Sequence, residues 1–143
     1  MRHPQENVKQ KLGLAPVALG ATGSNAGKII DRKGYAGVEY LVIYGAITTT
    51  GTVVTAVMKE GDATGSMTSV ADADMIGTEA LAGLAASTDR TSGSGKLVVK
   101  RVGYKGNKRY VSLDLNGTGT TSVGVVAVAA FMHTPEAAPV ANP

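Results

Sequence analysis

Apolar and polar residues alternate along the segment from Lys96 to Leu115, in two runs separated by turn-forming residues. In the second run, Tyr110–Leu115, Val and Leu occupy every other position, which is the period of a half-buried strand. The first run, Lys96–Gly103, is rich in valine, and Tyr104–Asn107 supplies the Gly and Asn that tight turns need. The pattern therefore predicts a β-hairpin over residues 96–115.

A second hairpin is predicted from Val38–Tyr44 and Thr52–Met58, with a threonine-rich turn between them. Both faces of Val38–Ile43 are mostly apolar, which predicts a central strand that is covered on both sides. Shorter apolar runs predict four further strands: Leu14–Leu19, Lys28–Asp31, Met67–Val70 and Val123–Met132. Pro16 restricts the first of these to an edge strand, or itself to the first residue of a strand.

Helical composition is confined to residues 72–86, where Gly77 and Gly83 limit it to a single turn near Ala73–Ile76. Short strands without strand–helix–strand alternation are typical of an antiparallel β-sandwich or barrel. We therefore expect an all-β fold of about seven or eight short strands. Residues 13–132 would form this β-domain. Residues 1–12 would form an extended N-terminal arm, either loose throughout or ending in an edge strand, and its deletion is expected to leave the β-domain folded. Residues 133–143 would form an extended C-terminal tail.

The composition predicts a core of small side chains. Glycine supplies 19 of the 143 residues, Cys and Trp are absent and Phe occurs once. Because Val, Leu, Ile and Ala would have to fill the core, additional burial through oligomerisation is expected. No apolar run approaches the ~20 residues of a membrane-spanning helix, and the N-terminus lacks the apolar region of a secretory signal. We expect synthesis in the cytoplasm and no contact with a membrane.

Three patterns resemble sites of chemistry, and none is complete. Gly20–Lys28 is similar to a phosphate-binding loop, but Thr22 replaces its first Gly and Ile29 its hydroxyl residue. The two histidines, His3 and His133, lie in the predicted terminal segments, where nothing would position them as ligands or bases. The paired aspartates at 72 and 74 are expected to cap a turn. We therefore expect no enzyme, catalytic residue, cofactor, metal ion or small-molecule substrate.

Basic residues gather in the hairpin predicted over 96–115, which holds six of the 14 Lys and Arg and no acid before Asp114. One interpretation is contact with nucleic acid or an acidic protein, with Tyr104 and Tyr110 available for stacking. The other is a solvated strand face on which cations protect an edge from aggregation. The net charge of +3 is smaller than duplex-DNA binders usually carry, so nucleic acid is the less favoured partner.

Four segments resemble a family of small virion proteins of tailed bacteriophages, typically encoded beside the major capsid protein. They are DRKGYAGVEYLVIYGAITTTGT at 31–52, VADADMIGT at 70–78, VGYKGNKRYVSLDL at 102–115 and HTPEAAPV at 133–140. The most specific element is the pattern GY-x-G-x-KRY at Gly103–Tyr110. The resemblance implies a capsid decoration, or cement, protein. Such β-rich modules bind the outer capsid surface and hold neighbouring capsid subunits together.

This resemblance implies that the partner is the major capsid protein and that the location is the capsid surface of the virion. It also implies a homo-oligomer, with a trimer favoured. The expected contacts come from the terminal segments and the basic residues: Lys9, Lys11, Arg101, Lys105, Lys108, Arg109, His133 and Pro135. Two alternatives remain, a head–tail connector or tail component and a nucleic-acid-binding β module.

Overall fold

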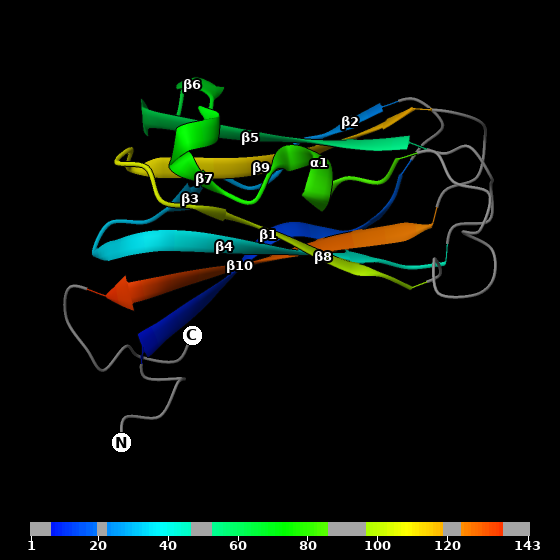
Figure 1. Cartoon of the computed structure of the whole chain (residues 1–143), viewed down its shortest axis with the longest axis horizontal. Helices are drawn as coiled ribbons and strands as arrows, with labels where there is room; N and C mark the ends of the chain where they lie inside the picture. Colours follow the sequence, from blue (N-terminus) through cyan, green and yellow to red (C-terminus); the bar gives the residue numbers. More distant parts are fainter. Residues whose placement is uncertain (1–6, 20–22, 47–52, 86–96, 119–123, 136–143) are drawn as a thin grey trace.

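Two antiparallel sheets face each other as a sandwich in the computed structural model (Figure 1), which confirms the all-β prediction. The structure describes residues 7–19, 23–46, 53–85, 97–118 and 124–135. Sheet A has the strand order β1 (Val8–Ala18), β10 (Val125–Pro135), β4 (Tyr35–Tyr44), β8 (Val99–Tyr104) and β7 (Met75–Ile76). Sheet B has the order β2 (Gly23–Asn25), β9 (Tyr110–Thr118), β5 (Val53–Ala63) and β6 (Ser66–Ser69), and β3 (Ile30–Asp31) also pairs with β9. The strands exceed the seven or eight expected because several are only two to four residues long.

Neither predicted hairpin forms. In both cases the connection that was expected to be the hairpin turn passes from sheet A to sheet B. β8 pairs with β4 in sheet A, whereas β9 pairs with β5 in sheet B. β4 and β5, the strands of the second expected hairpin, are separated in the same way. An alternating pattern shows which face of a strand is buried, but it does not identify the neighbouring strand. Residues 88–95, whose sequence TDRTSGSG predicts a loop, lie outside the described residues.

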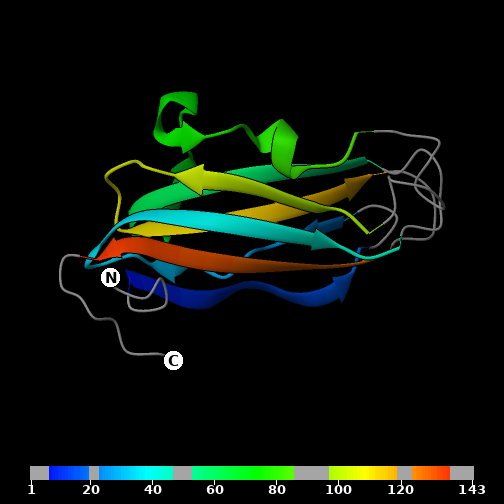
Figure 2. The same cartoon turned by 60° about the horizontal axis from the view of Figure 1, so that its bottom comes forward.

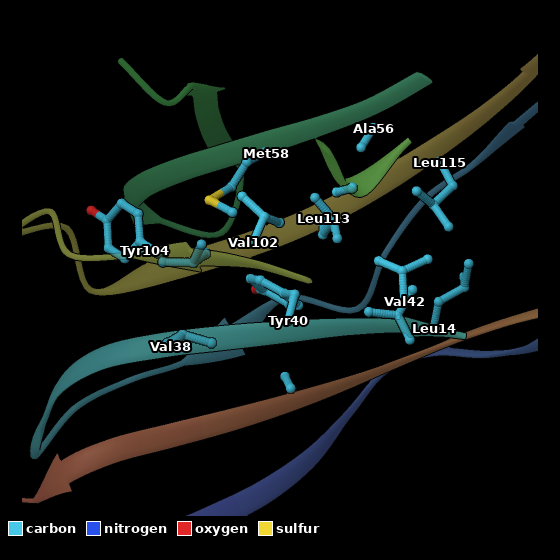
Figure 3. Close-up of a cluster of buried hydrophobic side chains, with 14 of the residues drawn as sticks. Leu14, Val38, Tyr40, Val42, Ala56, Met58, Val102, Tyr104, Leu113 and Leu115 are labelled. Atoms are coloured by element: carbon cyan, nitrogen blue, oxygen red, sulfur yellow. The ribbon is translucent and has the colours of Figure 1, made fainter. Parts of the chain in front are cut away.

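The core lies between the sheets and contains more aromatic surface than the composition suggests. Figure 3 shows Tyr40 and Val42 of β4 pointing toward the layer that carries Leu113 and Leu115 of β9, and all four side chains are fully buried. Tyr40, Tyr44 and Tyr104 are the largest buried side chains in the described residues. Most core residues are Val, Leu, Ile or Ala, as expected, but the expectation that aromatic residues take no part was wrong. Three of the five tyrosines fill the space that small residues leave.

β4 is the central strand of sheet A, as predicted, but only its inner face is covered. Val38 and Val42 face the core and are fully buried. Ile43, on the opposite face, is 43% exposed. Apolar residues on both faces of this strand predict burial on both sides, but its outer face is open to solvent.

The folded part is wider than the predicted domain of residues 13–132. Val8–Leu12 pair with β10 in the order Val8 with His133 to Leu12 with Ala129, and Pro135 still pairs with Tyr35. Part of the expected arm and the start of the expected tail are thus strand residues. Deleting residues 1–12 would remove five paired residues of β1, so such a truncation is not expected to leave the sandwich intact. A deletion confined to residues 1–6 keeps this pairing.

A buried aspartate fastens the connection between β2 and β3 onto β9. The Gly27 amide donates a 2.8 Å hydrogen bond to Asp114 Oδ1, and Lys59 Nζ lies 2.7 Å from Asp114 Oδ2. Asp114 is only 6% exposed, so these two partners compensate a charge that would be costly alone. A Cβ atom at position 27 would lie less than 3.0 Å from the carbonyl oxygen and carbon of Leu113. Only glycine therefore allows the chain to pass this close to β9.

Two short turns replace the single one predicted near residues 73–76. A 3-10 turn, η2 (Asp72–Asp74), precedes β7, and α1 (Glu79–Ala82) follows it. The Tyr44 hydroxyl donates to the Ala82 carbonyl at 2.8 Å, while Leu84 and Val54 exchange two backbone hydrogen bonds of 2.8 Å. Because Tyr44 belongs to sheet A and Val54 to sheet B, this segment joins the two layers. No helix in the described part of the chain has the length and apolar character needed to cross a membrane.

Candidate functional site

Five cations from two segments of the chain gather at one end of the sandwich, on the left in Figure 1, and we call them the basic end. They are Arg32, Lys33, Lys105, Lys108 and Arg109. The β3–β4 connection supplies the first two residues, and the β8–β9 connection supplies the other three. Arg32 Nε donates to the Lys108 carbonyl, which joins the two connections directly. The sequence predicted three of these residues. Arg32 and Lys33 were missed because nothing in their own segment indicates its neighbour.

The buried Tyr104 hydroxyl organises this end. It donates to the carboxylate of Glu60 and accepts a 2.9 Å hydrogen bond from the Lys108 amide. The Arg32 guanidinium lies over the Tyr104 ring, 5.4 Å from its centre, and donates to the Tyr35 carbonyl at 3.0 Å. Burial, together with the bond to Glu60, raises the pKa of Tyr104 to about 12. The hydroxyl therefore stays protonated and holds β5, β8 and the β8–β9 connection together.

Replacing Tyr104 with Phe is expected to lower the free energy of unfolding by about 1–3 kcal/mol. The substitution keeps the ring but leaves the Lys108 amide and the Glu60 carboxylate without their shared partner. Urea denaturation followed by circular dichroism measures the effect. Tyr110→Phe is the matched control, because the Tyr110 ring packs against Arg109 and its hydroxyl has no hydrogen bond in the described residues. Equal stability of the two variants would show that the hydroxyl network does not hold this end.

Ion pairs reduce the charge of the basic end without cancelling it. Arg109 donates two hydrogen bonds, of 3.0 and 2.7 Å, to the Asp31 carboxylate, and Lys108 Nζ lies 2.6 Å from Asp62 Oδ2. The bond from Lys108 lowers the pKa of Asp62, and the same pairing raises the pKa of Lys108. Lys33 and Lys105 are exposed and form no ion pair within the described residues.

The Arg109 guanidinium is expected to control the titration of Asp31. Its hydrogen bonds are the main reason that the pKa of Asp31 falls from 3.8 to about 2. Stability from this pair is therefore present above pH 4 and is lost as the pH falls through about 2. Arg109→Gln should return the pKa of Asp31 toward 3.8, as measured by NMR titration of the side-chain carboxyl carbon. An unchanged pKa would contradict this assignment, and Arg101→Gln is the control.

The remaining expected contact residues lie away from the basic end. Lys9 and Lys11 are on the edge strand β1, and His133 and Pro135 are at the end of the neighbouring strand β10. Arg101 lies on the outer face of β8 and is 3.7 Å from Glu39 of β4. The structure thus divides the eight residues into a basic end, one edge of sheet A and one isolated ion pair. The basic end holds three of the expected residues in one connection, which Arg32 joins to a second connection through the Lys108 carbonyl.

Open hollows, rather than a deep pocket, mark the surface near these residues. A hollow of about 290 Å³ at the basic end is lined by Arg32, Lys33, Gly34, Tyr35 and Arg109. It offers positive charge and donor groups to an acidic side chain. Within the described residues, no group of three or more His, Cys, Asp or Glu is placed to hold a metal ion.

Comparison with known proteins leaves the family of this chain open. No protein-family profile and no curated protein matches it. Among solved structures, it is similar to the CBM22-1–GH10 modules of the N-terminal part of xylanase 10B from Clostridium thermocellum, in complex with xylohexaose. The identity is 14%, the match covers 85% of this chain and 26% of the other, and the TM-score is 0.37. This chain thus spans about a quarter of that protein, and so low a TM-score supports no functional inference.

Proposed function

We propose that this chain is a structural protein of a tailed-bacteriophage virion, a decoration protein that binds the outer capsid surface and bridges major capsid protein subunits. The observation that carries the proposal is the basic end, where the β3–β4 and β8–β9 connections place five cations around a rigid tyrosine network. The virion setting comes from the resemblance of residues 30–140 to small virion proteins of tailed bacteriophages. The basic end supplies the docking surface that such a role requires.

Charge and rigidity both favour an acidic protein surface as the partner. The five cations are accompanied by three carboxylates that bond to this cluster, Asp31, Glu60 and Asp62, which leaves an excess of two positive charges. A surface with mixed charge fits a protein partner of opposite overall sign, because complementary potentials steer association and fix orientation. The hydrogen bonds of Arg32 and Tyr104 hold the site in one conformation, so little order is lost on binding.

The same carboxylates weigh against the nucleic-acid alternative. Asp31 pairs with Arg109 and Asp62 pairs with Lys108, the two cations that precede Tyr110 in the sequence. The two aspartates would repel phosphate groups. A gel shift tests this alternative directly, because several phosphate contacts would produce a band that disappears steeply as salt is raised. We expect no shift at low salt.

The proposal is tested by adding the purified chain to capsids assembled without it from the capsid protein encoded beside it. Cosedimentation should show saturable binding that weakens as salt is raised, because the contact is electrostatic. Chain that remains in the supernatant at every salt concentration would overturn the proposal. Bovine serum albumin serves as the control for trapping in the pellet.

A further inference from the structure

The outer face of sheet A carries most of the exposed large hydrophobic side chains in the described residues. Eight large hydrophobic side chains are exposed in that part of the chain, and six of them belong to this face or its border. These six are Leu12, Ile43, Ile76, Leu81, Val99 and Val125. Figure 2 shows β8, β4, β10 and β1 side by side in this sheet.

The strand register makes this surface continuous. Ala127, Ile43 and Val99 form one row across β10, β4 and β8. The next row contains Leu12, Ala129, Leu41 and Arg101, and the third contains Gln10, Phe131, Glu39, Gly103 and Ile76. Side chains in one row lie on the same side of the sheet. A hollow of about 520 Å³ lies at the β7–β8 side of the face. Its apolar lining comes from Ile76, Leu81 and Val99, and its polar lining from Glu39, Lys100, Arg101 and His133.

The size of the surface matches that of a protein–protein contact. Six side chains that are each about half exposed present on the order of 500 Å² of apolar surface. That area is at the upper end for the largest patch of a monomer and more than half of the ~800 Å² that each partner buries in a standard interface. Ala127, Ala129 and Gly103 keep the middle of the face shallow, so a second flat sheet can approach closely.

The charges of the face indicate a second copy of the same chain as the partner. Its rows carry one acid and one base, Glu39 and Arg101, whose side chains are 41% and 79% exposed. In the single chain they lie 3.7 Å apart as an ion pair, so the face has no net charge and does not favour a partner of either sign. A copy related by a two-fold axis presents the same pair in reverse, so that Arg101 of each copy can meet Glu39 of the other. Interfaces between identical chains are also the more apolar class.

We propose that two copies of this chain associate through the outer faces of their sheets A, about a two-fold axis. The contact uses the apolar rows of β10, β4 and β8 and leaves the basic end free. It therefore does not depend on capsid docking, and either proposal can fail alone. A two-fold contact predicts an even number of subunits, unlike the trimer that the resemblance implies.

Sedimentation velocity of the full chain over a range of micromolar concentrations tests the association. The double substitution Ile43→Lys and Val99→Lys places two charges in the centre of the contact and should weaken association by about 100-fold. Both positions face solvent in the single chain, so circular dichroism should show an unchanged fold. Ile29→Lys is the matched control, because Ile29 is also exposed but lies between β2 and β3, outside this face.

Mixing two charge variants tests the two-fold arrangement itself. Glu39→Arg and Arg101→Glu each place like charges across the contact, so each variant alone should associate more weakly than the wild type. Their equimolar mixture restores opposite charges at both sites and should associate as heterodimers. A wild-type monomer, an odd-numbered oligomer, or association that both lysines leave unchanged would overturn the proposal. A mixture that associates no better than its components would overturn it as well.

Discussion

Alanine at position 27 is expected to destabilise the chain by about 3 kcal/mol or more, a large part of the ~5–15 kcal/mol by which a typical domain is stable. The added Cβ would lie less than 3.0 Å from the Leu113 carbonyl, and Leu113 is fully buried in the middle of β9. Relief of the clash requires a shift of Gly27 or of β9. The first breaks the hydrogen bond from the Gly27 amide to Asp114, and the second disturbs the pairing of β9 with β5.

Urea denaturation measures this effect, and Gly65→Ala is the matched control. Gly65 lies in the β5–β6 turn, and a Cβ there would meet nothing within 4 Å. The control should change the free energy of unfolding by no more than about 0.5 kcal/mol. If Gly27→Ala is as stable as Gly65→Ala, the β2–β3 connection does not lie against β9 as described.

Reversing the two unpaired charges of the basic end should weaken capsid binding by about 100-fold, roughly tenfold for each substitution. Lys33→Glu and Lys105→Glu change exposed side chains without ion pairs, so the fold and the Tyr104 network should persist. The loss arises because an acidic partner would then face two additional carboxylates. Cosedimentation with capsids at fixed salt measures the change.

Lys28→Glu is the control for this experiment. It alters the net charge of the chain by two units, but Lys28 is exposed in the β2–β3 connection, outside the basic end. If net charge alone controlled binding, this single substitution would weaken capsid binding by about tenfold, half of the double variant's effect in free energy. Docking through the basic end instead predicts little change in capsid binding. If Lys28→Glu weakens capsid binding as much as each substitution at the basic end, docking is not specific to the basic end.

The sequence was sufficient to predict the fold class because strand patterns depend on neighbouring residues. Alternation at Tyr110–Leu115 placed Val111, Leu113 and Leu115 in the core, and the single proline of Leu14–Leu19 placed that segment at an edge. Pairing depends on contacts between distant segments, and such contacts leave no local pattern. Both expected hairpins failed for this reason.

The candidate site was predicted only in part, for a similar physical reason. Lys105, Lys108 and Arg109 are close in sequence and stay close in the structure. Arg32 and Lys33 join them only because β3 pairs with the start of β9, where Ile30 lies opposite Val111. Arg101 lies away from them because it belongs to β8 rather than to the connection that follows. Its side chain points outward from sheet A, next to Glu39. A cluster of charges along a strand does not become a cluster in space when the strands separate into two layers.

A cryo-electron microscopy map of capsids carrying this chain tests the docking surface most directly. Docking through the basic end predicts density for the sandwich distributed over the outer shell, with Lys33 and Lys105 facing the capsid protein. Density in which that end points to solvent, or a ring of copies confined to the portal axis, would contradict the assignment.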